Sequence, residues 1–274
     1  MTCADLIDEL AAGARVLGWS EGLHNRAEFL RARNAVVAHL VRRGTLRVVA
    51  AETNFALSRP VDAWLGGAGP DTPPEDVVHG VWSWNRTGLR DNAVLLRWLR
   101  RHNAGVPPQR RVRFVGLDAF GATRPAPAAL PAEDVALADE LRAVAAAHAD
   151  HRDVDVRDGA QHRALCAVAD RFPGERILLF EQVGHLDPGL PGSLGARLRE
   201  HGPGPFTAVA AVWRDGEPDV SFPLGRYAGL SRRLASSPLR PGPSGTGLLD
   251  LRGTGSDFAA ALYTPALSNA EEFR

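Results

Sequence analysis

The chain has 274 residues, of which 45% are hydrophobic and 23% are charged. This balance is typical of a globular protein with a sizeable core, and it excludes a disordered or collagen-like chain. The 32 cationic side chains are all arginine, and they are balanced by 32 acidic ones. Because no net charge is left to attract phosphates, we expect neither nucleic acid nor a membrane as a partner.

The two cysteines, Cys3 and Cys166, lie far apart and fit no metal-ligand spacing. We therefore expect neither a disulfide framework nor a zinc site. The first ten residues lack the basic start and apolar run of a signal peptide. Nor does any apolar run approach the roughly 20 residues that a membrane helix needs. These features predict a cytoplasmic protein.

Short apolar runs alternate with helical stretches, which is the pattern of a mostly parallel sheet covered by helices. The expected elements of the first half are a strand at 14–18, a helix at 28–42, a strand at 47–52, a helix at 91–102 and a strand at 112–118. Those of the second half are helices at 132–148 and 159–172, a strand at 176–180, a helix at 194–200, a strand at 206–213 and apolar segments at 248–251 and 258–263. We predict an α/β fold forming a single domain over residues 1–274.

Residues 236–247 are rich in proline, glycine and serine, a composition that predicts a flexible loop, which we place over the site. A helical insertion is expected at about 124–173, after the third strand.

Titratable residues follow most of the predicted strands. They are Glu21, His24, Glu52, Asp118, Glu181 and His185. In an open α/β sheet the site lies outside the carboxyl ends of the strands, so parallel strands would bring these groups to one rim. Two imidazoles and several carboxylates there could supply a general base, a general acid and an orienting group.

Each of these residues also has a purely structural interpretation. An acid at a helix start often caps the helix, and Asp118 could hold a turn. A Glu/His set could bind a divalent ion, but the chain lacks His-Glu-x-x-His, paired cysteines and a calcium loop. No phosphate-binding loop with lysine is found either. We therefore predict an acid–base site with no metal and no cofactor.

The ordered residues resemble the erythromycin esterase family. The matching segments are Glu21–Phe29 (EGLHNRAEF), Leu46–Asn54, Trp82–Asp91 with Trp98–Asn103, Phe114–Asp118, and Ile177–His185 followed by Ser193–Leu198. The resemblance covers most of the chain, and the ordered set is far more specific than any single motif. It implies a three-layer α/β fold, with the insertion at 124–173 reduced relative to the family.

The resemblance also implies hydrolysis of a lactone or other ester by activated water, without a covalent intermediate. His24 would be the general base, Glu21 and Glu52 would orient it or the water, and His185 would stabilise the oxyanion or protonate the leaving group. The residues expected to bind substrate are Glu28, Arg31, Trp84, Asp118 and Gln182. The expected substrate is a small-molecule natural product or a modified peptide.

The chain departs from the family pattern at several positions. Gln182 stands where the family has a histidine, Asn25 where it has glycine, and Gly88 where it has glutamate. Gln182 can donate a hydrogen bond to an oxyanion but cannot carry a proton. Two alternatives to hydrolysis therefore stay open: a tailoring enzyme of antibiotic biosynthesis that eliminates, dehydrates or cyclises, and a catalytically silent binding protein.

Overall fold

The computed structural model describes residues 2–70, 90–120, 130–147, 154–214, 227–242 and 245–268. Within these ranges one sheet has the strand order β3-β2-β4-β1-β5-β8-β7-β6. The strands are β1 (Val16–Glu21), β2 (Val48–Asn54), β3 (Arg113–Asp118), β4 (Ile177–Gln182), β5 (Phe206–Trp213), β6 (Arg240–Pro241), β7 (Gly247–Asp250) and β8 (Ala260–Thr264). Strands β1 to β5 and β8 run parallel, and β7 is antiparallel to both of its neighbours.

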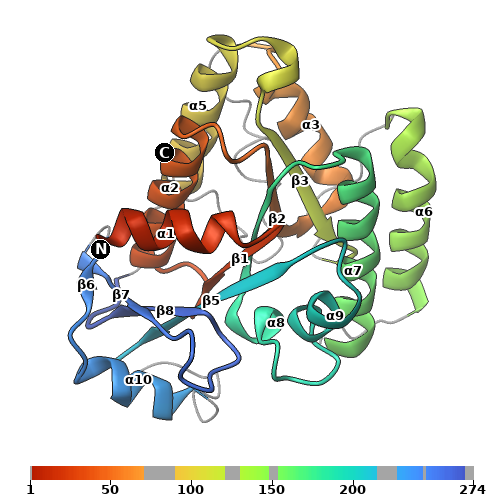
Figure 1. Ribbon diagram of the computed structural model, residues 1–274. Coiled ribbons are helices and arrows are strands. Elements are labelled where there is room, and N and C mark those ends of the chain that lie inside the picture. Colours follow the sequence, from red (N-terminus) through yellow and green to blue (C-terminus); the bar gives the residue numbers. More distant parts are fainter. Residues whose placement is uncertain are drawn as a thin grey trace.

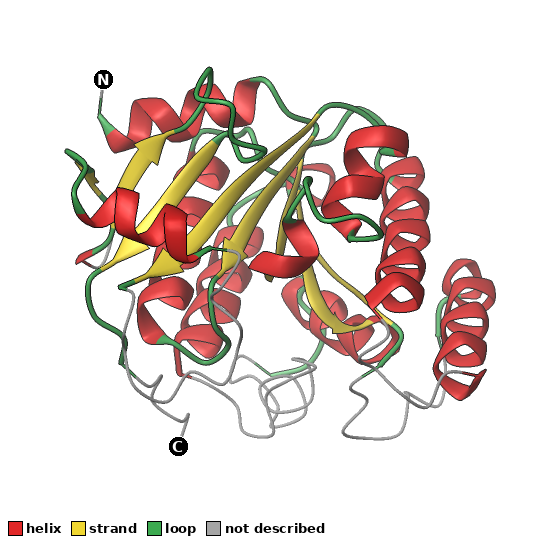
Figure 2. Ribbon diagram, turned by 90° about the horizontal axis from the view of Figure 1, so that it is seen from below, coloured by secondary structure: helices red, strands yellow, loops and turns green. Residues whose placement is uncertain are grey.

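Helices cover both faces of the sheet, which gives three layers (Figures 1 and 2). One face packs against α1 (Cys3–Ala12), α2 (Ala27–Arg42), α3 (Phe55–Leu65) and α5 (Arg90–Ala104). The other packs against α6 (Ala132–Ala147), α7 (Val154–Arg171), α8 (Val183–Leu186), α9 (Leu194–His201) and α10 (Ala228–Ala235). A short 3-10 turn, η1 (Pro108–Arg110), precedes β3.

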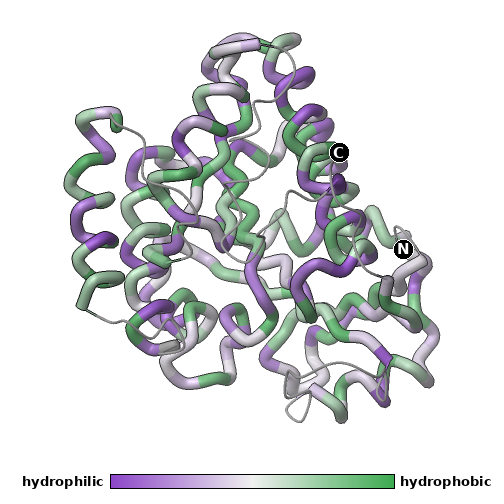
Figure 3. Tube along the Cα trace, turned by 180° about the vertical axis from the view of Figure 1, so that it is seen from behind, coloured by the Kyte–Doolittle hydropathy of each residue, from purple (hydrophilic) through white to green (hydrophobic). Residues whose placement is uncertain are grey.

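Successive side chains along each strand point to opposite faces of the sheet, so the strand contributes to the core on both faces. In β1, Leu17 and Trp19 join the cluster under α2, whereas Val16 joins the cluster under α7. Both faces are covered, so the central parallel strands are buried along nearly their whole length. Along the helices, hydrophilic and hydrophobic residues alternate (Figure 3). The core therefore fixes where each parallel strand ends, and the ends of the strands carry the site.

The predicted α/β fold with a mostly parallel sheet is confirmed. Strands β1 and β4 extend to Glu21 and Gln182, past the predicted apolar runs at 14–18 and 176–180. The predicted placement of the loop at 236–247 over the site is wrong. Residues 240–241 form β6 at the sheet edge opposite β3, and 247–250 form β7. The single domain stays a prediction.

The helices α1, α3, α8 and α10 were not predicted, although α1 and α3 each begin with a recognisable cap. Thr2 caps α1 by accepting a hydrogen bond from Asp5 N, while the Asp5 side chain accepts one from Thr2 N. Asn54 caps α3 by accepting from Leu57 N. Pro60 inside α3 hid this helix from the sequence pattern. No helix in the described parts of the chain is long and apolar enough to cross a membrane.

Candidate active site

The carboxyl ends of four neighbouring strands bring the polar residues together. Glu21 ends β1, Glu52 lies near the end of β2, Asp118 ends β3, and Gln182 ends β4. Strand β4 pairs with both β1 and β2, and β2 pairs with β3. The predicted convergence at one rim of the sheet follows from this order.

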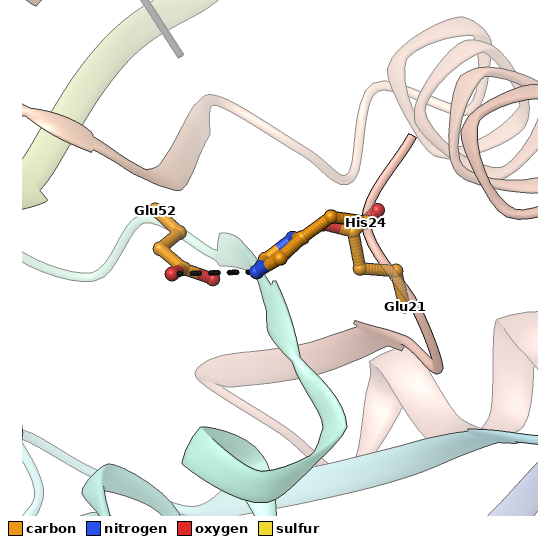
Figure 4. Close-up of side chains that lie close together, drawn as sticks. All are labelled: Glu21, His24 and Glu52. Carbon is orange, nitrogen blue, oxygen red and sulfur yellow. Dashed lines mark hydrogen bonds and ion pairs between the residues drawn. The ribbon is translucent and has the colours of Figure 1, made fainter. Parts of the chain in front are cut away.

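His24 lies in the turn between β1 and α2, flanked by two carboxylates (Figure 4). Its Nδ1 lies 2.6 Å from Glu21 Oε1, and its Nε2 lies 3.9 Å from Glu52 Oε1. Asn25 has a φ of 63°, the left-handed region that asparagine tolerates better than most residues, and this turns the chain into α2. The bond to Glu21 fixes the ring, so that Nε2 faces Glu52.

The charge state of His24 follows from this setting. Burial opposes the imidazolium, but the negative charges of Glu52 and Glu21 outweigh burial and raise the pKa of His24 to about 9. At neutral pH the resting site therefore holds His24 mainly protonated, with about one ring in a hundred neutral at pH 7.

Glu52 is held by Arg157, which reaches the site from α7. Arg157 Nη2 donates to Glu52 Oε1 at 2.6 Å and to Asp118 Oδ2 at 2.6 Å. Glu52 Oε2 accepts from Gln182 N at 3.2 Å. Although burial opposes its charge, Arg157 and His24 hold the pKa of Glu52 well below its usual range. Glu52 is thus an ionised, fully coordinated carboxylate.

His185, in α8 directly after β4, is oriented by an acid from α7, Asp158. Its Nδ1 lies 2.5 Å from Asp158 Oδ1, and Asp158 Oδ2 accepts from Leu194 N at 2.8 Å. The other ring nitrogen, Nε2, lies 3.3 Å from Arg157 Nη1 and 3.9 Å from Glu52 Oε1. Burial favours the neutral ring, but Asp158 outweighs it and raises the pKa of His185.

Only some of the residues expected to bind substrate lie in the cluster. Asp118 and Gln182 lie in the cluster, and the Gln182 Nε2 group is buried without a hydrogen-bond partner. Glu28 instead accepts hydrogen bonds from the backbone and side chain of Ser268. Arg31 is about half exposed and pairs with Asp91. Trp84 lies outside the described residues.

Three charged residues of this region were missed at the sequence level: Arg157, Asp158 and Arg33. Arg157 and Asp158 are in α7, which begins at Val154 rather than at the predicted 159. Arg33 is fully buried in α2, with its guanidinium 4.7 Å from the ring centre of Phe180. A buried arginine has no distinctive spacing in an arginine-rich chain. The one available signal was the apolar run around Arg33, which makes its face of the helix a core face.

The cluster also contains a set of possible metal donors. One donor atom each of Glu21, His24 and Glu52 lies within 4.8 Å of the others, close enough to share a cation. Two of these groups already interact with each other, and Glu52 is bonded to Arg157. A cation at this position would have to displace the guanidinium from Glu52, so the donor set fits a metal poorly.

Comparisons with known proteins agree with this fold. A family model described as erythromycin esterase matches residues 41–169. Three solved structures share the fold over nearly the whole chain. They are a Bacillus cereus protein (12% identity, 98% of this chain and 92% of that chain covered, TM-score 0.67), a succinoglycan biosynthesis protein (11%, 97% and 91%, 0.66), and a mutant of the erythromycin esterase EreC in its open conformation (12%, 97% and 94%, 0.63).

At these identities the structural likeness shows the fold alone, which is a three-layer α/β fold. The family model covers just under half of the chain, and over these residues the chain is similar to the erythromycin esterase family.

Proposed function

We propose that the protein hydrolyses an ester or lactone with water that His24 activates. The observation that carries this proposal is the position of the His24 ring, bonded to Glu21 at Nδ1 and facing Glu52 from Nε2. A base must be held within reach of the proton it takes, directly or through one water. Glu21 orients the ring, and Nε2 points towards Glu52, which is the side on which we place the attacking water.

In the proposed reaction, neutral His24 takes a proton from water at Nε2 while the water oxygen bonds to the ester carbonyl carbon. Glu21 stabilises the imidazolium that forms. The carbonyl oxygen becomes an oxyanion, which the unpartnered Gln182 Nε2 group can stabilise by donating a hydrogen bond. The C–O bond then breaks, and protonated His185 supplies the proton for the departing alcohol.

The substrate class is proposed from chemistry rather than from fold. A site with two imidazoles and no serine or cysteine nucleophile among its named residues suits attack by water on an activated carbonyl. We propose a small natural product or a modified peptide that carries an ester or lactone. Elimination or cyclisation on the same base is the competing outcome, and the experiment below separates the two.

The test is mass spectrometry of a panel of macrolactones and linear esters incubated with the protein in ¹⁸O-labelled water. We expect one labelled carboxylate product with the wild type and a loss of rate of about 10²- to 10⁴-fold in His24→Ala. His39→Ala is the matched control, because His39 pairs with Asp8 on the outer side of α2, and it should retain full activity.

Unlabelled product that depends on His24 would replace hydrolysis with elimination or cyclisation. Labelled product formed equally by wild type and His24→Ala would remove His24 from the chemistry.

A further inference from the structure

A fifth acidic side chain, Glu181, lies within this cluster but takes no part in the proposed reaction. It is the residue before Gln182 in β4, and it is completely buried. Neither of its carboxyl oxygens has a hydrogen-bond partner. An ionised carboxylate in such a place would cost several kcal/mol without a partner, so Glu181 is a group whose presence needs an explanation.

The charged residues that act on Glu181 belong to β2, β3 and α7. Three acids act on it, and the cation that could compensate them is Arg157. The acids are Glu52 of β2, Asp118 of β3 and Asp158 of α7. The register partner on β1 is the uncharged Ser20, whose Oγ accepts from Ala211 N.

The guanidinium of Arg157 is already committed to other groups. Its Nη2 donates to Glu52 and Asp118, its Nε donates to Asp118 at 3.3 Å, and its Nη1 lies 3.3 Å from His185 Nε2. All three nitrogens of the fork thus face groups other than Glu181. An ionised carboxylate at Glu181 would compete with Glu52 and Asp118 for this cation.

We propose that Glu181 is a positioning residue that acts as a neutral carboxylic acid: while it keeps its proton, Arg157 stays bound to Glu52 and Asp118, and Glu52 stays beside His24. Burial and the charge of Glu52 raise the pKa of Glu181 well above its ordinary value, which agrees with the geometry. This inference rests on the proposed function for its purpose but not for its test.

The test has two spectroscopic readouts that need no substrate. Infrared spectroscopy of the wild type at neutral pH should show the carbonyl band of a buried protonated carboxylic acid. That band should be lost in Glu181→Gln and kept in the matched control Glu200→Gln, since Glu200 is an exposed residue of α9. A spectrum without the band, or a band that survives in Glu181→Gln, would overturn the proposal.

The second readout is an NMR titration of His24 in the same variants. Glutamine is neutral and nearly isosteric with a protonated glutamate, so the pKa of His24 should be equal in wild type and Glu181→Gln. If Glu181 were ionised, removing its charge would lower the pKa of His24, and that result would contradict the proposal. Thermal melting of Glu181→Gln confirms that the variant is folded.

The role in positioning is tested by ¹⁵N NMR of the Arg157 side chain, whose signal is identified by its loss in Arg157→Lys. The signal should be the same in wild type and Glu181→Gln at neutral pH. A displaced Arg157 signal in Glu181→Gln would show that the guanidinium contacts Glu181 directly, which overturns the proposal. If no substrate is ever hydrolysed, the proposed function fails while these results still decide the state of Glu181.

Discussion

At the residue scale, the site is a network of alternating charges, and Arg157 is the cation that joins two of its carboxylates. It is 4% exposed and bonded to two buried carboxylates, Glu52 and Asp118. Removing one partner of a buried ion pair leaves the other charge without compensation, which costs more than the pair itself contributes. The buried ion pairs of the site therefore contribute to the stability of the fold as well as to the proposed reaction.

Arg157→Leu should lower the free energy of unfolding by about 3–5 kcal/mol for this reason. Chemical denaturation measures the loss. Arg163→Leu is the control on the same helix, because Arg163 and its partner Glu140 are about half exposed, and such pairs contribute about 0–1 kcal/mol. Equal losses in the two variants would show that the Arg157 network does not stabilise the protein.

At the element scale, the short helix α8 depends on its contact with α9. A Cβ at Gly195, in α9, would lie 2.4 Å from the carbonyl oxygen of Leu186, the last residue of α8. His185 immediately precedes Leu186, so the close approach of the two helices sets where this imidazole lies. Glycine is required here by the contact with backbone, which cannot move aside as a side chain can.

Gly195→Ala should therefore separate α8 from α9, weaken the contact of His185 with Asp158, and lower the melting temperature by several degrees. Differential scanning calorimetry and the NMR signal of His185 report the two effects. Gly229→Ala in α10 is the control, since no atom lies within 4 Å of its added Cβ, and it should be neutral or slightly stabilising. Similar behaviour of the two alanine variants would refute the contact argument.

The sequence predicted elements where periodicity was strong and missed them where local chemistry decided. The helix predicted at 28–42 is α2 at Ala27–Arg42, and the strand predicted at 206–213 is β5. The start of α7 was placed five residues late because its first turn, Val-Asp-Val-Arg, has no apolar stripe. That error hid Arg157 and Asp158, since both lie in the part of α7 assigned to no helix.

At the scale of the whole molecule, the order of the parallel strands explains why polar residues far apart in the sequence lie together in one site. The rule that ligands bind beyond the carboxyl ends of parallel strands needs no knowledge of packing, and it brought Glu21, His24, Glu52 and His185 together. It could not specify partners from the covering helices, because helix orientation depends on tertiary contacts. Glu28 and Arg31 lie close to His24 in sequence, but Glu28 accepts a hydrogen bond from Ser268 and Arg31 pairs with Asp91.

The raised pKa of His24 also links folding to pH. The folded state holds the proton more tightly than the unfolded chain, whose histidine titrates near 6.5. The resulting stabilisation is complete below pH 6.5 and is lost as the pH rises through about 9. We expect the difference in unfolding free energy between wild type and His24→Gln to shrink over this interval. Denaturation at pH 6 and pH 9.5 measures it, and a difference that grows with pH would contradict the assignment.

The most direct test of the central claim is the pH dependence of kcat/KM for the ester identified by the ¹⁸O experiment. If neutral His24 is the base and protonated His185 the acid, kcat/KM should rise about tenfold per pH unit from pH 6. The rise should stop where His185 loses its proton or where His24 becomes neutral near pH 9. In Glu52→Gln the rise should end at a lower pH, because the charge that raises the pKa of His24 is gone. A wild-type rate that is constant or falls between pH 6 and 8 would show that His24 does not act as the base.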